Sequence, residues 1–336
     1  MYEKVLFVEN FKIFNDWASK TYPYKCEAIQ KDEKFITINN FDEEMCPSIK
    51  QHRPKAIVLG WHAACVNKYY TSKRDFYSKY VKDLETKQEV IEKLKGIFEN
   101  SIPKYVVVQD MHDEDYENGI TGFINYLKEY NITGIITPYY KTKNIQRLQK
   151  EIPHLKVLWL PHHIDHTKFK SYSVDKCYDI LLFGNDHPKY YPFRHRIIKL
   201  LSNDQQHDIT VRKLEKPRNY FKYNAGISNN SLSKLMNKSW LTLCTSSNLD
   251  YLLGKYFETS FSGCTIVGNM ATDGQEIWKD NYVNIHDKMS DSEIIETIKD
   301  ALNNKEKLNE MSKSMQQIVC KNYKLCDFSQ HLYDLL

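Results

Sequence analysis

The chain has 336 residues, which is enough for two domains that each bury a hydrophobic core. Lys and Arg number 47 against 43 Asp and Glu, and this small, dispersed excess disfavours a protein that binds nucleic acid through its phosphates. The low glycine and proline counts, 11 and 10, exclude collagen-like and linker-rich chains. Eight cysteines lie far apart without a C-x-x-C pair, which is typical of free thiols in a reducing compartment.

The sequence shows no sign of export or membrane insertion. It begins with MYEKVLFVENFKIFNDW, in which the apolar run is too short for the central region of a signal peptide. No stretch approaches the ~20 apolar residues that span a bilayer. We therefore expect a soluble, cytoplasmic protein without stable membrane insertion.

Short apolar runs alternate with longer amphipathic stretches in the first half of the chain. The runs are almost wholly apolar, as expected for strands buried on both faces of a parallel sheet. We expect strands at 4–8, 56–59, 105–109, 134–137 and 157–160. Helical spacing between them is clearest over 76–98 and 122–130. This alternation predicts a doubly wound α/β domain over residues 1–162.

The same alternation starts again after a polar stretch at 163–176, which we interpret as a linker. We expect strands at 178–183, 208–211, 241–244 and 264–267, and helices at 193–202, 231–237, 253–262, 291–303 and 305–320. A second doubly wound domain is therefore predicted over 177–320, and residues 321–336 have the apolar spacing of a final helix. Two such domains face each other across a cleft where the carboxyl ends of their strands bind ligands.

The most informative motif spans residues 248–269, with the sequence NLDYLLGKYFETSFSGCTIVGN. It predicts a loop, a helix that carries Glu258, a helix end at Gly263 and a buried strand. Asp250 precedes Glu258 with seven residues between them. The motif resembles the E-x7-E region of GT-B glycosyltransferases of the retaining, group 1 type, in which the second Glu begins a similar helix–glycine–strand pattern.

This resemblance implies that Glu258 binds the ribose of a nucleotide, because one carboxylate accepts hydrogen bonds from both ribose hydroxyls. The start of the helix before it would present N–H groups to the diphosphate. Asp250 stands where the family has its first Glu, and the resemblance implies a catalytic role for both acids. The alternative for Glu258 is an ordinary acid on the exposed face of an amphipathic helix.

Residues 134–169 resemble the last strand and the interdomain crossing of the same family. The matching residues are Pro161, Ile164, Asp165 and Phe169. Histidines at 162, 163 and 166 raise the alternative of a zinc site. Adjacent histidines point in different directions, however, and no partner pair is visible in the sequence. We therefore expect no bound metal.

Residues 178–201 predict a strand, a glycine turn and a helix, and they resemble the start of the C-terminal domain in this family. There, basic residues after the strand contact the donor diphosphate, and a fixed cation stabilises the charge that develops on the leaving phosphate. Arg194 is the first candidate for this contact. The other candidates are Gly184, Lys189, Arg196 and Lys255. Solvated basic residues on a helix are the alternative.

Residues 105–116, YVVVQDMHDEDY, resemble the strand end that contacts sugar in the N-terminal domain of these transferases. The resemblance implies that His112 contacts the sugar or an acceptor hydroxyl, and an inverting enzyme would use His112 or Asp113 as its base. Asp113 and Asp115 also form a D-x-D pattern, which binds Mg²⁺ or Mn²⁺ in single-domain transferases. The repeated α/β pattern disfavours that reading. Trp61 follows another strand and is either an acceptor platform or a packed aromatic.

Taken together, the resemblance implies a GT-B glycosyltransferase of glycan biosynthesis, of the hexosyl or a related type. It would move a sugar from a nucleotide-sugar donor to a hydroxyl of a glycan or other acceptor, with retention and without a metal or other cofactor. The helix at 321–336 would cross back to the N-terminal domain. A nucleotide-sugar epimerase of the same fold is one alternative. The other is a degenerate nucleotide- or sugar-binding protein, to which Asp250 in place of Glu points.

Overall fold

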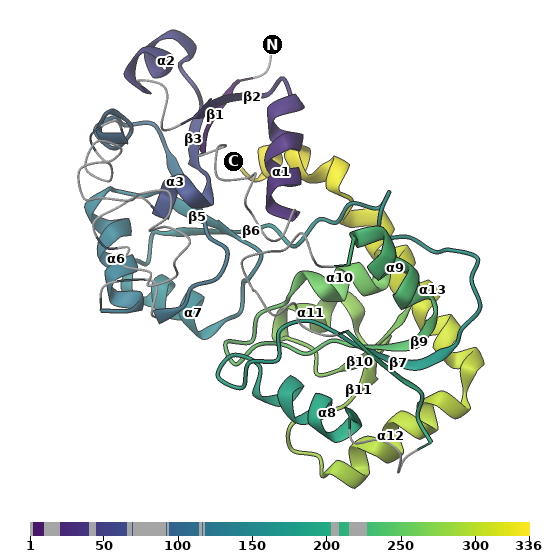
Figure 1. The fold of residues 1–336 in the computed structure, drawn as a ribbon. Helices are drawn as coiled ribbons and strands as arrows, with labels where there is room; N and C mark the ends of the chain where they lie inside the picture. Colours follow the sequence, from purple (N-terminus) through teal and green to yellow (C-terminus); the bar gives the residue numbers. More distant parts are fainter. Residues whose placement is uncertain are drawn as a thin grey trace. The chain divides into compact units, whose positions relative to one another are not determined.

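The chain folds into two compact units, each built around one parallel sheet (Figure 1). A computed structural model describes residues 3–9, 21–39, 45–65, 69, 92, 94–113, 116, 118–202, 208–214 and 227–336. The first unit contains Met1–Pro161 and Phe328–Leu336, and the second contains His162–Asp327. The prediction of two doubly wound α/β sheets is confirmed.

The sheet of the first unit has six strands in the order β2-β1-β3-β4-β5-β6. They are β1 (Val5–Glu9), β2 (Phe35–Asn39), β3 (Ala56–Leu59), β4 (Lys104–Val107), β5 (Gly134–Thr137) and β6 (Lys156–Trp159). Five of these lie within about two residues of the predicted strands. The sixth, β2, was not predicted, because this edge strand (FITIN) is only half-buried and lacks the continuous apolar run of the central strands.

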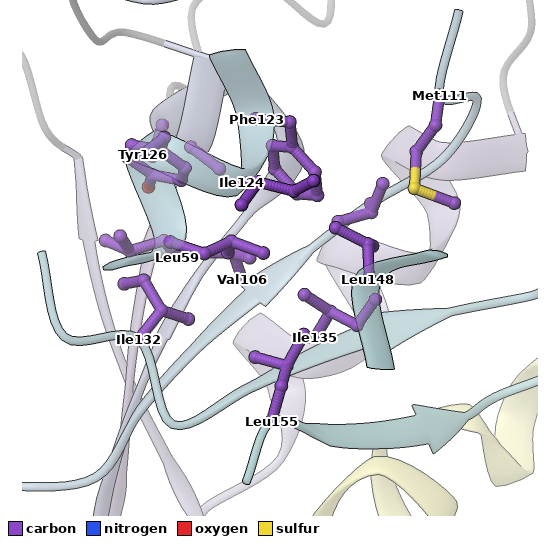
Figure 2. Packing of buried hydrophobic residues seen from close by; sticks show 14 of the residues in the cluster. Leu59, Val106, Met111, Phe123, Ile124, Tyr126, Ile132, Ile135, Leu148 and Leu155 are labelled. Carbon is purple, nitrogen blue, oxygen red and sulfur yellow. The ribbon is translucent and has the colours of Figure 1, made fainter. Parts of the chain in front are cut away.

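Helices cover this sheet with their apolar stripes. They are α1 (Thr21–Lys31), α2 (Met45–His52), α3 (Trp61–Cys65), α6 (Ile120–Glu129), α7 (Lys143–Glu151) and α14 (Phe328–Leu335). Phe123, Ile124 and Leu127 of α6 are buried at helical spacing. Figure 2 shows Phe123 and Ile124 packed near Val106 of the sheet. Burial of each such side chain contributes about 1.5–3 kcal/mol.

Helix α14 comes from the far end of the sequence and lies beside α1 (Figure 1). The ammonium of Lys25 on α1 lies 5.2 Å from the centre of the Phe328 ring. Tyr333 Oη donates a hydrogen bond to the Glu3 carbonyl at 3.0 Å. The first unit therefore includes a segment that the chain supplies only after the second unit. The helix predicted at 76–98 lies largely outside the described residues.

The sheet of the second unit has the order β11-β10-β9-β7-β8. Its parallel strands are β7 (Tyr178–Leu182), β8 (Val211–Lys213), β9 (Ser239–Leu243), β10 (Thr265–Gly268) and β11 (Val283–Asn284). The strand expected at 208–211 is wrong in position, because the pairing with β7 begins only at Val211. The chain runs from β7 to β8 on one side and then returns to β9 on the other side.

Two layers of helices enclose this sheet. They are α8 (Pro192–Ser202), α9 (Asn229–Asn237), α10 (Gly254–Phe261), α11 (Thr272–Trp278), α12 (Asp291–Asn303) and α13 (Lys305–Asn322). Leu182 of β7 belongs to a core with Ile197 of α8, and its neighbour Leu181 belongs to another core with Phe257 of α10. Successive side chains of a strand point to opposite faces, so both faces of the sheet are buried.

Within the second unit, the two segments that connect it to the first lie side by side. Ile164 N donates to the Tyr323 carbonyl at 3.0 Å, and Leu325 N donates to the Ile164 carbonyl at 2.9 Å. Residues 163–176, the expected linker, belong to this unit, and Ile164 and Phe169 are buried in its core. No helix in the described ranges combines the length and the apolar character that crossing a membrane requires.

Candidate functional site

A group of polar residues gathers where β7 and β9 end in the second unit. These neighbouring strands lie where the direction of the chain reverses, and open α/β sheets bind ligands at such a point beyond their carboxyl ends. Gly184 follows β7 and has a φ of +95°, in the left-handed region that favours glycine. A Cβ at Gly184 would lie 3.5 Å from Arg194 Nη1 and 3.5 Å from Lys255 Nζ. Two cations therefore flank this glycine.

Arg194, in the first turn of α8, connects the ends of the two strands. Its Nε donates to Thr245 Oγ1 at 3.0 Å, and its Nη2 donates to the Thr245 carbonyl at 2.8 Å. Nη1 donates to the Asn185 carbonyl at 2.7 Å, and the guanidinium lies 4.2 Å from the centre of the Tyr191 ring. The side chain is buried. These contacts hold its positive charge in one position beside Gly184.

Lys255 lies in the first turn of α10 and is also buried. Its Nζ donates to the Phe183 carbonyl at 3.0 Å and lies 4.2 Å from the centre of the Phe183 ring. Burial, with a further contribution from the charge of Arg194, lowers the pKa of Lys255 from 10.5 to about 7. The ammonium is therefore easily deprotonated until an anion binds next to it.

Glu258 follows Lys255 at the next turn of α10, on the same side of the helix. Its carboxylate forms no hydrogen bond or ion pair with another residue in the described part of the chain. Burial raises the pKa of Glu258 to about 7, and the charge of Lys255 partly opposes this rise. Among the described residues, this half-buried carboxyl group therefore keeps unused hydrogen-bond acceptors.

Asp250 is engaged in a structural contact. Its Oδ2 accepts hydrogen bonds from Thr272 N at 3.1 Å and from Thr272 Oγ1 at 2.5 Å, at the start of α11. The residue has a φ of +58°, which aspartate tolerates better than most side chains. This contact fastens the loop before α10 to the next helix. The predicted catalytic role of Asp250 therefore competes with a clear structural one.

The other two residues predicted to contact phosphate, Arg196 and Lys189, have their own contacts elsewhere in the second unit. Arg196 is two residues from Arg194 on α8, so its side chain leaves the helix on another side. It binds Asp291 Oδ1 through Nε at 2.9 Å and through Nη2 at 2.6 Å, where α12 begins. Lys189 is exposed in the loop before α8, and its carbonyl accepts a hydrogen bond from Asn248 Nδ2 at 2.9 Å. Its loop thus adjoins the one that precedes α10.

In the first unit, the predicted acceptor-side residues lie at the carboxyl edge of the sheet. His112 Nε2 lies 3.8 Å from Asp110 Oδ2, and Asp110 Oδ1 accepts a hydrogen bond from Tyr139 Oη at 2.9 Å. Asp113 Oδ1 accepts from Ile120 N at 3.2 Å and so caps helix α6.

Trp61 lies at the start of another helix, α3, where its backbone N donates a hydrogen bond to Tyr22 Oη at 2.7 Å.

The described residues contain no group of three or more His, Cys, Asp or Glu side chains that could hold a metal ion. The ring of His162 packs against Phe257 with centroids 6.0 Å apart, and the ring of His163 packs against Tyr323 at 6.1 Å. These neighbouring imidazoles therefore contact different aromatic residues. Asp115 of the D-x-D pattern lies outside the described residues.

Sequence reasoning did not single out Glu9, the last residue of β1. Its fully buried carboxylate accepts hydrogen bonds from Ala63 N at 3.0 Å and from Tyr22 Oη at 2.5 Å, and Oε1 lies 3.4 Å from His62 Nδ1. A Cβ on Gly60 would lie 2.3 Å from Glu9 Oε2, so a larger residue there would displace the Glu9 carboxylate. An acid that ends an apolar strand, VLFVE, was the available signal.

Similar solved structures identify the fold. Sucrose-phosphate synthase from Thermosynechococcus elongatus matches with a TM-score of 0.59 at 8% identity, covering 99% of this chain and 98% of that one. HepE from Anabaena, solved with UDP, matches with a TM-score of 0.58 at 12% identity, covering 98% of both chains. This chain has the GT-B fold. The fold implied by the resemblance in the sequence is therefore confirmed.

TarM from S. aureus, solved with Fondaparinux, alpha-GlcNAc-glycerol and UDP, matches this GT-B chain with a TM-score of 0.54 at 9% identity. The match covers 86% of this chain and 57% of TarM. Comparisons with protein-family models and with curated proteins find no match. At these identities the likeness describes the fold, and the role of each site residue rests on its own geometry.

Proposed function

We propose that this protein transfers a sugar from a nucleotide-sugar donor to a hydroxyl of a glycan acceptor. The cations of Arg194 and Lys255 on either side of Gly184 carry the proposal, together with Glu258, which lies one turn after Lys255 on α10. HepE has been solved with UDP and with UDP-glucose, which supports a nucleotide-sugar donor for a chain of the same fold.

In this proposal the donor diphosphate lies beside Gly184, where the missing side chain lets a phosphate approach the backbone. Arg194 and Lys255 neutralise the charge that develops on the leaving diphosphate. Helix α10 begins at Gly254 without a side-chain cap, so its first turn also favours a negative charge. These groups supply the positive charge that a metal ion would otherwise supply, and we propose a metal-independent reaction. Undiminished turnover in the presence of EDTA would support this.

Glu258 binds the ribose in this proposal, with its two carboxylate oxygens accepting from the two hydroxyls. The first unit binds the acceptor, and half-buried His112 at the edge of its sheet contacts the sugar or the acceptor hydroxyl. We propose a retaining hexosyl transfer, which the sequence motif around Glu258 supports. Analysis of the anomeric configuration of the product by NMR tests this part.

A thermal-shift screen tests the donor site. Nucleoside diphosphates and nucleotide sugars are added to the full chain, and a ligand at 100 times its dissociation constant stabilises a protein by about 2.7 kcal/mol. We expect at least one of them to raise the unfolding temperature by several degrees. If none does, the donor site proposed here is wrong.

Nucleotide binding should be strongest near pH 7 and weaker on both sides. Lys255 has a pKa of about 7 in the free protein, and a bound diphosphate raises it, so affinity falls as the pH rises above 7. Glu258 also has a pKa of about 7, and ribose hydrogen bonds lower it, so affinity falls as the pH decreases below 7. Calorimetric titrations from pH 5.5 to 8.5 measure the nucleotide affinity on the acidic and the alkaline limb of this pH profile. Lys255→Arg should remove the alkaline limb alone, and a flat wild-type profile would contradict the assignment.

A second candidate is a nucleotide-binding protein without turnover, which the contact between Asp250 and Thr272 favours because it occupies the carboxylate predicted to be catalytic. Binding alone does not separate the two. Incubation with the nucleotide sugar that binds best, followed by measurement of the released nucleoside diphosphate with and without glycan acceptors, distinguishes them. Release that depends on an acceptor supports transfer, and no release over many hours supports the binding protein.

A further inference from the structure

The first unit contains a small cavity that the proposed reaction does not use. It lies between α1, the sheet and α14. Its walls include the apolar side chains of Phe7, Ile136, Leu160, Phe328 and Leu332, and the polar side chains of Tyr22, Lys25, Gln109 and Thr137. About 20 Å³ is open to the centres of water molecules, against roughly 10–15 Å³ for one ordered water. The cavity therefore has room for one or two water-sized groups, such as the two oxygens of a carboxylate.

Lys25 brings a positive charge to this cavity. The residue is only 4% exposed, and its ammonium forms no hydrogen bond or ion pair with any residue in the described ranges. The ring of Phe328 lies 5.2 Å away and offers only a weak cation–π contact. Burial lowers the pKa of Lys25 from 10.5 to about 8, so the group is still mostly charged at pH 7. A buried charge without a counter-ion is unfavourable, and an anion would offset this.

The other polar groups of the cavity fit an anion as well. The side-chain amide of Gln109 forms no hydrogen bond with a described residue, and Thr137 Oγ1 accepts from Tyr139 N, which leaves its O–H free to donate. The hydroxyl of Tyr22 already donates to Glu9. No Asp or Glu side chain lines the cavity. The cavity thus offers hydrogen-bond donors and no acidic group, and the rest of its wall is largely apolar.

We propose that this cavity binds a small carboxylate group, with Lys25 as its counter-ion and Gln109 as a second donor. The apolar walls accommodate the short aliphatic part of such a ligand. The site lies within the first unit and is independent of the nucleotide site, so it stands or fails separately from the proposed function.

The test measures the unfolding midpoint of the full chain in sodium acetate at fixed ionic strength, with neutral acetamide as the isosteric control. We expect acetate to raise the midpoint with a saturating dependence, and acetamide to leave it unchanged. Lys25→Met should weaken the apparent acetate affinity about tenfold or more, since it removes a charge-assisted hydrogen bond. Lys31→Met, at an exposed position on the same helix, should respond like the wild type.

Equal responses to acetate and acetamide, or an unchanged response in Lys25→Met, would overturn the proposal. Lys25→Met could also fail to fold, and Gln109→Leu then provides the second variant. It removes one donor at the half-buried end of the cavity and should reduce the acetate affinity while the unfolding midpoint without acetate stays close to the wild-type value. A Gln109→Leu protein that binds acetate as tightly as the wild type would equally count against the site.

Discussion

Nucleotide affinity should fall on the order of 100-fold or more in Glu258→Ala, because the variant loses two charge-assisted hydrogen bonds of about 1.5–3 kcal/mol each. The measurement is a calorimetric titration with the nucleoside diphosphate that gives the largest thermal shift. Glu306→Ala, at an exposed acid on α13, is the matched control and should bind like the wild type. Unchanged affinity in Glu258→Ala would refute the ribose contact.

Replacement of Glu258 by Gln should lower the nucleotide affinity without lowering the free energy of unfolding. This combination distinguishes a binding role of Glu258 from a structural one. Because the pKa of Glu258 is raised in the folded protein, this group makes the wild type lose stability as the pH rises from 4.5 to about 7, whereas the lowered pKa of Lys255 has the opposite effect above pH 7. Glu258→Gln removes this loss, so at pH 8 it should be at least as stable as the wild type while binding nucleotide poorly. Urea unfolding at pH 6 and pH 8 measures the difference. A clearly destabilised Gln variant would instead indicate that Glu258 supports the fold.

The largest loss of stability should follow removal of the Glu9 carboxylate. Glu9→Ala leaves the Tyr22 hydroxyl and the Ala63 amide without their acceptor inside the core of the first unit. Leaving two buried donors without an acceptor costs about 1–3 kcal/mol for each of them. The free energy of unfolding in urea, measured with circular dichroism, gives the value directly.

Two variants show whether this effect belongs to the hydrogen bonds of Glu9. Glu9→Gln keeps the shape and one acceptor oxygen, so it should lose less stability than Glu9→Ala. Glu99→Ala removes an exposed acid of the same unit and should change stability by no more than about 0.5 kcal/mol. If all three variants were equally stable, the buried carboxylate would have no structural role.

The central strands of both sheets could be predicted because burial on two faces imposes continuous apolar runs such as AIVL in β3 and TIVG in β10. Edge strands gave a weaker signal. β2 has only two buried residues among its five, and β8 is the charged segment VRK, which the prediction placed three residues too early. Helix α11 was not predicted, since it is only seven residues long and contains a glycine.

The candidate site was predictable in its elements but not in its individual contacts. The sequence placed Gly184, Arg194, Lys255 and Glu258 on the correct strand ends and helices, and their functional roles stay predictions. It ranked Arg194 first but kept Arg196 as an alternate, because only the packing of α8 turns one toward Gly184 and the other toward Asp291. Partners distant in sequence, such as Thr272 for Asp250, likewise appear only once the chain is folded.

The return of the chain to its first unit affects the order in which the protein can be completed during synthesis. Helix α14, which packs beside α1 and lines the cavity around Lys25, is translated only after the whole of the second unit. A nascent chain that has not reached Phe328 therefore exposes an apolar surface on its N-terminal half, however much of that half has already folded. The docking of α14, which completes the fold of the first unit, can therefore take place only after the second unit has been translated.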